Sequence, residues 1–220
     1  MRDQMLCVLL AAIAYGTSAG HCEGAQAGLS TVTFQSATYN DMRQLMAREA
    51  TSGAVTVKAT LGFPERARDR YPAVIIVHTL GGFRDSNEGY VAAELRKAGF
   101  ATLTYDSFAA RGTTGQALQG SPGYLAIGVA DAYAALKFLA SESRIAADRI
   151  AIIGFSYGAE VAHLAAFETL RSALTPGPGR FHPPRGVHAA VRARGHSGCR
   201  SVCRGHSRCW SVCHREAQSL

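Results

Sequence analysis

The chain of 220 residues lacks cysteine and net charge over most of its length. Cys7 and Cys22 lie near its start, four cysteines follow residue 198, and none occurs between. Residues 1–175 hold 15 Lys and Arg against 15 Asp and Glu, whereas residues 176–220 hold eight Arg and one Glu. The formal charge of +7 therefore lies entirely in the tail, and it says nothing about the partners of the main part. We expect no nucleic-acid binding.

Long apolar runs are also missing. The run from Met5 to Tyr15 is too short to span a bilayer. With an arginine before it and small residues after it, the run is typical of an export signal. We therefore expect residues 1–27 to be a signal peptide, the protein to be exported (periplasmic or secreted), and the cleaved chain to have no membrane attachment. A buried N-terminal helix is the alternative, since Asp3 reduces the positive charge expected of a signal.

Residues 28–175 read as one α/β domain. Apolar and β-branched runs predict five strands, of which the first two form an antiparallel pair and the others suit a parallel sheet. Residues 106–123 form a long loop. The expected strands cover 29–35, 54–61, 72–77, 100–105 and 149–153; the expected helices cover 85–99, with Asp85, Ser86 and Asn87 as caps, 124–139 and 159–170.

The sequence Gly154-Phe155-Ser156-Tyr157-Gly158 joins the last strand to the last helix. Two glycines allow the sharp turn that exposes a serine hydroxyl at the top of a sheet. The turn also places Ser156 at a helix N-terminus, where free N–H groups favour the negative charge of an acyl-transfer intermediate. A turn that uses Gly154 and Gly158 for packing alone is the alternative.

Three loops in this order carry a resemblance to a known family. They are residues 78–82 (HTLGG), 106–112 (DSFAARG) and 154–158 (GFSYG), each following a predicted parallel strand. Over residues 50–172 the chain resembles the dienelactone hydrolase family of α/β-hydrolases. The resemblance implies a mostly parallel sheet with flanking helices, no cofactor or metal, and an ester or lactone as small-molecule substrate.

The family pattern also implies roles for individual residues. Ser156 would be the nucleophile, where members named for the dienelactone reaction have cysteine, so a general ester hydrolase is favoured. The backbone N–H groups of Leu80 and Tyr157 would form the oxyanion hole, although Leu80 can equally be an ordinary turn residue. Arg111 would bind a substrate carboxylate; a structural pair with Asp106 or a solvated loop position is the alternative.

His78 is not expected to be catalytic. It lies at the end of the strand expected over residues 72–77, where it is expected to form local hydrogen bonds that hold the following loop, which contains Leu80.

The sequence has no aspartate after Asp148. A serine nucleophile of this fold needs an Asp or Glu and then a His downstream, and the later carboxylates are Glu160, Glu168 and Glu216. Glu160 and Glu168 lie on the helix expected directly after residues 154–158, the turn that we call the elbow. Glu216 follows every histidine. We therefore expect a partial hydrolase domain over residues 28–175, with its C-terminal half missing and with weak or no activity.

Residues 176–220 form a basic Cys/His/Arg-rich tail with no pattern that predicts a strand, and we expect it to be disordered. The segments 194–203 and 204–213 are near-repeats that contain Cys199, Cys203, Cys209 and Cys213. A zinc site, disulfides or an anionic partner are alternatives, and they would make the chain a non-catalytic binding protein. Out-of-frame translation of GC-rich DNA is the interpretation that we favour.

Overall fold

The computed structural model describes residues 28–175, 200–202 and 210–212. The expected signal peptide and the four tail cysteines lie outside these residues. The elements in chain order are β1 (Leu29–Ser36), α1 (Met42–Ala47), β2 (Val55–Gly62), β3 (Tyr71–Val77), the π-helical turn η1 (Asp85–Gly89), α2 (Tyr90–Lys97), β4 (Ala101–Tyr105), the 3₁₀ turn η2 (Ala109–Arg111), α3 (Gly115–Leu118), α4 (Tyr124–Ser141), β5 (Ile145–Gly154), α5 (Tyr157–Ala165), α6 (Glu168–Leu174), β6 (Arg200–Val202) and β7 (Trp210–Val212).

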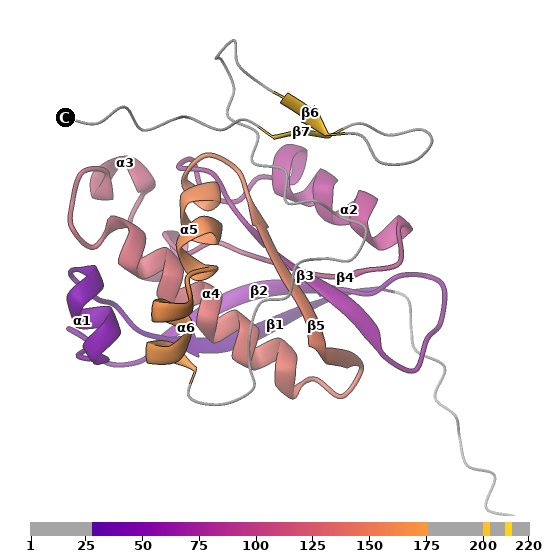
Figure 1. Ribbon diagram of the computed structural model, residues 1–220, viewed down its shortest axis with the longest axis horizontal. Helices are drawn as coiled ribbons and strands as arrows, with labels where there is room; N and C mark the ends of the chain where they lie inside the picture. The colour runs from indigo at the N-terminus through magenta and orange to yellow at the C-terminus, as the bar shows by residue number, and fades with distance from the viewer. Residues whose placement is uncertain (1–27, 176–199, 203–209, 213–220) are drawn as a thin grey trace, which may run out of the picture.

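Strands β1 to β5 form one mixed sheet in the order β1-β2-β4-β3-β5 (Figure 1). β1 pairs with β2 and β2 with β4 in antiparallel fashion, whereas β3 runs parallel to both β4 and β5. Four strands therefore point the same way, and β2 alone is reversed. The expected strands and the antiparallel opening pair are confirmed. The carboxyl ends of β3, β4 and β5 meet at one edge, where α/β folds place their sites.

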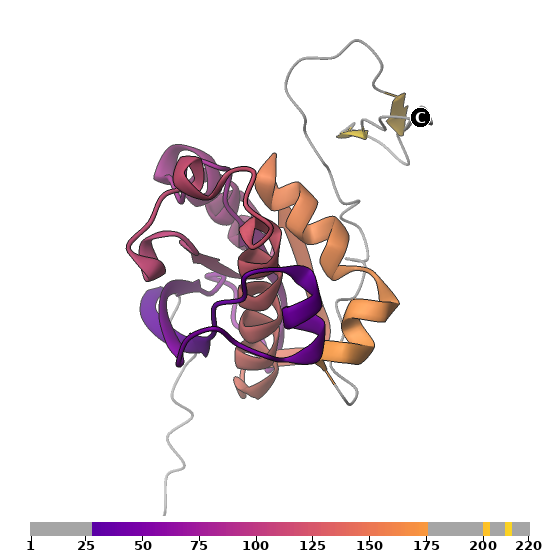
Figure 2. The same ribbon diagram turned by 90° about the vertical axis from the view of Figure 1, so that its left-hand side faces the viewer.

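Helices cover both faces of the sheet unequally. α1, α4, α5 and α6 contribute to the large core on one face, and α4 and α5 cross the sheet side by side (Figures 1 and 2). On the other face, α2 packs Ala92 against Val74, Ile76 and Ala151 in a small core. By length and composition α4 could cross a membrane, but most of its residues are buried within this fold.

The expected caps of the helix after β3 are wrong. Arg84 precedes η1 as its N-cap, and no side chain of Asp85, Ser86 or Asn87 caps this turn. Instead, the Glu88 side chain reaches back and accepts the Arg84 N–H at 2.9 Å. A carboxylate from within the turn has replaced the expected cap.

The helix expected over residues 159–170 is two helices. α5 ends at Ala165, Phe167 takes an extended conformation, and α6 begins at Glu168. The buried Tyr133 hydroxyl donates to the Ala165 carbonyl at 2.8 Å, and this contact holds the end of α5. Residues 159–170 contain no proline or glycine, so nothing local in the sequence indicates the interruption.

Five short elements were not expected: α1, β6 and β7, and also η2 and α3, which lie within the long loop predicted over residues 106–123. Asp41 is the N-cap of α1; its side chain accepts the Gln44 N–H, while the Gln44 side chain accepts the N–H of Asn40. This Asp-x-x-Gln pattern is a capping-box signal in the sequence. In the tail, β6 and β7 pair antiparallel with Ser201 opposite Ser211, which corrects the expectation that the tail has no strand.

Candidate functional site

The turn between β5 and α5 holds Ser156 in a strained conformation. Its φ is 52° and its ψ is −118°, and besides Arg48 it is the sole non-glycine residue with positive φ in the described part of the chain. Such a conformation costs about 1–3 kcal/mol and persists where the surroundings impose it. Ser156 is exposed, while Tyr157, Gly158 and Ala159 after it are buried. The turn therefore presents the serine hydroxyl to solvent at the N-terminus of α5.

The two glycines flanking Ser156 permit this turn by close backbone approach. A Cβ on Gly154 would lie 2.1 Å from the Gly158 carbonyl oxygen. A Cβ on Gly158 would lie 2.4 Å from the Val77 carbonyl oxygen and 2.6 Å from that of His78. The elbow thus packs directly on the end of β3. Gly154 and Gly158 therefore have the packing role that the sequence analysis gave as an alternative, and the strained serine is present as well.

The loop after β3 leaves one backbone N–H free. Of residues 79–84, Thr79 and Arg84 donate to Glu88, Phe83 donates to Asp106, and the two glycines donate back to Thr79. Within the part of the chain that the structure describes, the Leu80 N–H has no acceptor. The N–H of Tyr157, at the first position of α5, is likewise free among these residues. These are the two N–H groups for which the family resemblance implies an oxyanion hole, and that role stays a prediction.

His78 holds this loop, as expected. Its ring is fully buried; Nδ1 lies 2.6 Å from the Thr79 carbonyl oxygen, and Nε2 accepts the Ser107 N–H at 3.0 Å. Because Nε2 accepts, the ring proton is on Nδ1. The ring stacks on Tyr157, with centroids 5.7 Å apart. Both nitrogens are occupied, so the ring ties β3, the β4 loop and the elbow together.

An aromatic cluster that was not predicted from the sequence packs around Tyr157, the residue after Ser156. The Tyr157 ring is buried against Phe108 and Tyr124, and its hydroxyl donates to the Tyr124 carbonyl at 3.1 Å. Burial raises the pKa of the Tyr157 hydroxyl. Gly128 makes room for this hydroxyl, since a Cβ there would lie 2.4 Å from it. The side chain of Tyr157 therefore anchors the N-terminus of α5.

Asp106 is a second residue whose role the sequence missed. Its Oδ1 accepts the N–H groups of Phe108 and Ala109, and its Oδ2 accepts that of Phe83. Asp106 therefore joins the loop after β4 to the loop after β3. Its position directly after a parallel strand was the available signal.

Arg111, for which the resemblance implies a substrate contact, is bonded within the fold. Its side chain is 7% exposed, and its guanidinium forms a two-armed ion pair with Asp131 at 2.8 and 2.9 Å. Its other N–H donors go to Ala37, Thr38 and Ser107. All five guanidinium N–H groups are thus used internally. The alternative of a structural pair is correct in kind, but the partner is Asp131 rather than Asp106.

No base contacts Ser156 among the residues that the structure describes. The histidines of this part are His78, whose nitrogens are occupied, and His163. His163 lies in the last turn of α5, where its exposed ring packs edge-on against Phe167. The remaining histidines lie outside the described residues. The described residues also contain no cluster of three or more His, Cys, Asp or Glu that could hold a metal ion.

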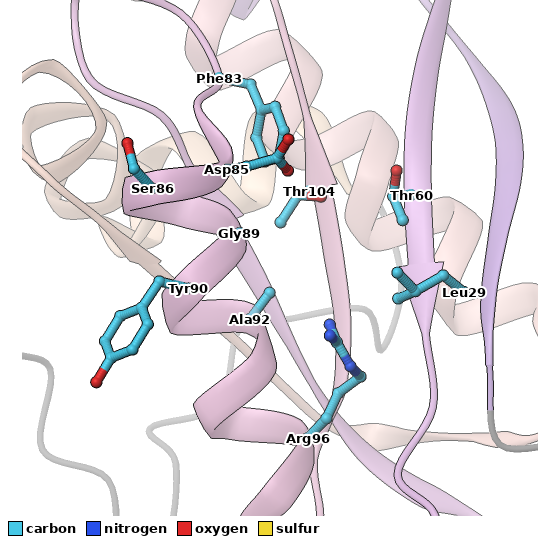
Figure 3. A pocket seen from close by; sticks show the side chains of 10 residues that line it. All are labelled: Leu29, Thr60, Phe83, Asp85, Ser86, Gly89, Tyr90, Ala92, Arg96 and Thr104. Atoms are coloured by element: carbon cyan, nitrogen blue, oxygen red, sulfur yellow. The ribbon is translucent and has the colours of Figure 1, made fainter.

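An open cavity lies between α2 and the sheet, away from the elbow (Figure 3). Neither Ser156, Leu80 nor Tyr157 lines it. Its lining residues are Leu29, Thr60, Phe83, Asp85, Ser86, Gly89, Tyr90, Ala92, Arg96 and Thr104. The residues of the candidate site therefore lie at the elbow and not in this cavity.

A family model and several solved structures are similar to this chain. The model of the dienelactone hydrolase family matches residues 57–183. Among solved structures, a hypothetical protein from Pseudomonas aeruginosa is 22% identical (TM-score 0.44; 66% of this chain and 41% of that chain covered). A dienelactone hydrolase-like promiscuous phosphotriesterase from metagenomic libraries is 21% identical (TM-score 0.44; 63% and 55% covered). An alpha/beta hydrolase from a Penicillium species is 19% identical (TM-score 0.44; 65% and 43% covered).

The chain spans about half the length of these solved structures. A search of curated proteins gave no match. The mixed five-stranded sheet with flanking helices confirms the expected fold class. Because the family model matches more than half of its residues, the chain belongs to the dienelactone hydrolase family.

Proposed function

We propose that this chain is a carboxylic ester hydrolase that uses Ser156 as its nucleophile. The observation that carries the proposal is the elbow: an exposed serine with φ 52° at the N-terminus of α5, packed against the end of β3. Membership of the dienelactone hydrolase family supports a hydrolase of this type. The substrate class is a small-molecule ester or lactone.

The chemistry is acyl transfer in two steps. The Ser156 oxygen attacks the ester carbonyl carbon and loses its proton to a base, and the carbonyl oxygen becomes an oxyanion. The N–H groups of Leu80 and Tyr157 would donate to this oxygen in a site prepared before the reaction. Collapse expels the alcohol, which takes up a proton, and water then releases the acid from the acyl-serine.

The base is the part that the described residues do not supply. We assign no described histidine to this role, because His78 is internally bonded and His163 packs on Phe167. Acylation by this chain is therefore expected to be slow. Water needs the same base to attack the acyl-serine, so deacylation is also expected to be slow, and the acyl-serine is therefore the product to detect.

The test uses p-nitrophenyl acetate and intact-mass spectrometry. The unmodified chain should release p-nitrophenolate and gain one acetyl group, and Ser156→Ala should abolish both. Ser86→Ala is the matched control, since Ser86 is also an exposed serine in the turn before a helix. Acetylation that persists in Ser156→Ala would contradict the proposal.

Export is part of the same proposal. Residues 1–27 have the composition of a signal peptide, and the domain begins with β1 at Leu29. Thr17-Ser18-Ala19 and Ala25-Gln26-Ala27 are the expected cleavage sites, so N-terminal sequencing of protein expressed with its leader should find a start near residue 20 or 28. A mature chain that begins at Met1 would contradict export by this leader.

A further inference from the structure

A buried carboxylate that the acyl-transfer steps do not use lies beside the oxyanion loop, residues 79–84. Glu88 belongs to η1, and its side chain is fully buried. Its Oε1 accepts the N–H of Thr79 at 3.1 Å, and its Oε2 accepts the N–H of Arg84 at 2.9 Å. One carboxylate thus binds both ends of the loop.

These two bonds restrict where the loop can place its free N–H. Between the two ends, Gly82 has φ 78° and donates to the Thr79 carbonyl, which makes a tight turn. Phe83 is fixed separately by Asp106 at 2.9 Å. Leu80 is the loop residue whose N–H is left for another acceptor, and it directly follows one of the two residues that Glu88 binds.

A carboxylate is the group that suits this position. Each of its two oxygens accepts one N–H, whereas a glutamine side chain has one acceptor oxygen and would turn an NH₂ group toward the second N–H. Leaving a buried N–H without an acceptor is costly, so the loop would shift to find one. The Leu80 N–H would move with it.

We propose that Glu88 is a positioning residue that fixes the Leu80 N–H for the oxyanion. The proposal rests on the function proposed above, because it assigns Glu88 a role in the acylation of Ser156. Glu88 contacts neither substrate nor the reacting atoms. It acts through the loop that it binds at both ends.

The test compares Glu88→Gln with Glu94→Gln. Glu94 lies on the adjacent helix α2 and pairs with Lys97 at the surface, so the same chemical change there leaves the oxyanion loop intact. Acetylation of Ser156 by p-nitrophenyl acetate is followed over a range of ester concentrations. Glu88→Gln should lower the limiting rate about tenfold to a hundredfold with little change in the half-saturating concentration, since the donor is misplaced only with respect to the transition state.

Amide hydrogen exchange gives a readout independent of activity. Peptides that cover residues 79–84 should exchange faster in Glu88→Gln than in the unmodified chain or in Glu94→Gln. Where Glu88→Gln does not fold, Glu88→Asp replaces it, because it keeps the carboxylate but is too short to bind both N–H groups.

The outcomes separate the two proposals. An unmodified chain that is not acetylated at Ser156 overturns the proposed function and the role of Glu88 with it. An unmodified chain that is acetylated, with a Glu88 variant equally fast, overturns the role of Glu88 alone. A slower rate with unchanged exchange at residues 79–84 also overturns it, because the loss then does not pass through the loop.

Discussion

Arg111 and Asp131 form a buried two-armed ion pair between η2 and α4. Nη2 lies 2.8 Å from Oδ1 and Nη1 lies 2.9 Å from Oδ2, and the Asp131 side chain is fully buried. Ser36 of β1 donates to the same carboxylate, and Arg111 reaches the carbonyl of Ala37. The pair therefore ties the start of the domain to its central helix.

Breaking this pair should destabilise the fold. Arg111→Ala leaves a buried carboxylate without its partner, and the free energy of unfolding should fall by about 3–5 kcal/mol in urea denaturation. Arg43→Ala is the control, since the Arg43–Asp41 pair lies at the surface, where an ion pair contributes little to stability. An Arg111 variant of normal stability that binds acidic esters poorly would instead favour the substrate contact predicted from the sequence.

The elbow glycines should not tolerate a methyl group. Gly158→Ala would press a Cβ against the carbonyl oxygens of Val77 and His78, and such overpacking costs about 1–3 kcal/mol or more. Thermal unfolding should show a clear drop in Tm for this variant. Gly53→Ala, where no atom lies within 4 Å of the new Cβ, should change little. Equal Tm values for the two variants would contradict the close packing of α5 on β3.

Stability should decline in alkali through the buried tyrosines. Burial raises the pKa of Tyr133 from 10.0 to about 12. The folded chain therefore holds this proton more tightly than the unfolded chain, and the stabilisation is complete below pH 10 and lost as the pH rises toward 12. Burial shifts the pKa values of Tyr105 and Tyr157 in the same direction.

Tyr133→Phe tests this dependence. Urea unfolding between neutral pH and pH 12 should give a shallower alkaline decline for Tyr133→Phe than for the unmodified chain. Tyr90→Phe, at a position that is 63% exposed, should leave the decline unchanged. An unchanged decline in Tyr133→Phe would contradict the predicted contribution of Tyr133.

The pH dependence of acylation should reveal that no described base assists Ser156. Without a general base, the acetylation rate should rise about tenfold per pH unit as the serine alkoxide fraction grows. A histidine base would instead give a plateau above about pH 7, since its unperturbed pKa is about 6.5. The rate between about pH 6 and 9 distinguishes the two. A plateau would mean that a histidine outside the described residues acts on Ser156.

The sequence predicts the strands and the elbow because both depend on local patterns. β-branched runs mark buried strands, and two glycines around a serine mark the turn, so Ser156 is found from neighbours in the chain. The local role expected of His78 is also confirmed, because its position at the end of β3 places Nδ1 beside the carbonyl oxygen of the next residue, Thr79. What depends on distant partners was not predictable in this way.

Tyr133 and Arg111 show this limit. The end of α5 is held by Tyr133, which lies 32 positions before Ala165. Arg111 pairs with Asp131, 20 positions away, although Asp106 is nearer in the sequence and was the partner considered in the sequence analysis. Glu88 is a different case, because its partners are near in the sequence. The expected caps Asp85, Ser86 and Asn87 make no cap bond, and the longer Glu88 side chain accepts two loop N–H groups at once.

Labelling with a fluorophosphonate tests the central claim most directly. The phosphonyl group should attach once per chain, and peptide mapping should find it on Ser156 in the unmodified chain and on no residue in Ser156→Ala. The strained elbow and the two free N–H groups predict this result, because phosphonylation also places an oxyanion in the same site. Absence of labelling, or labelling at another residue, would contradict the assignment of Ser156 as the nucleophile.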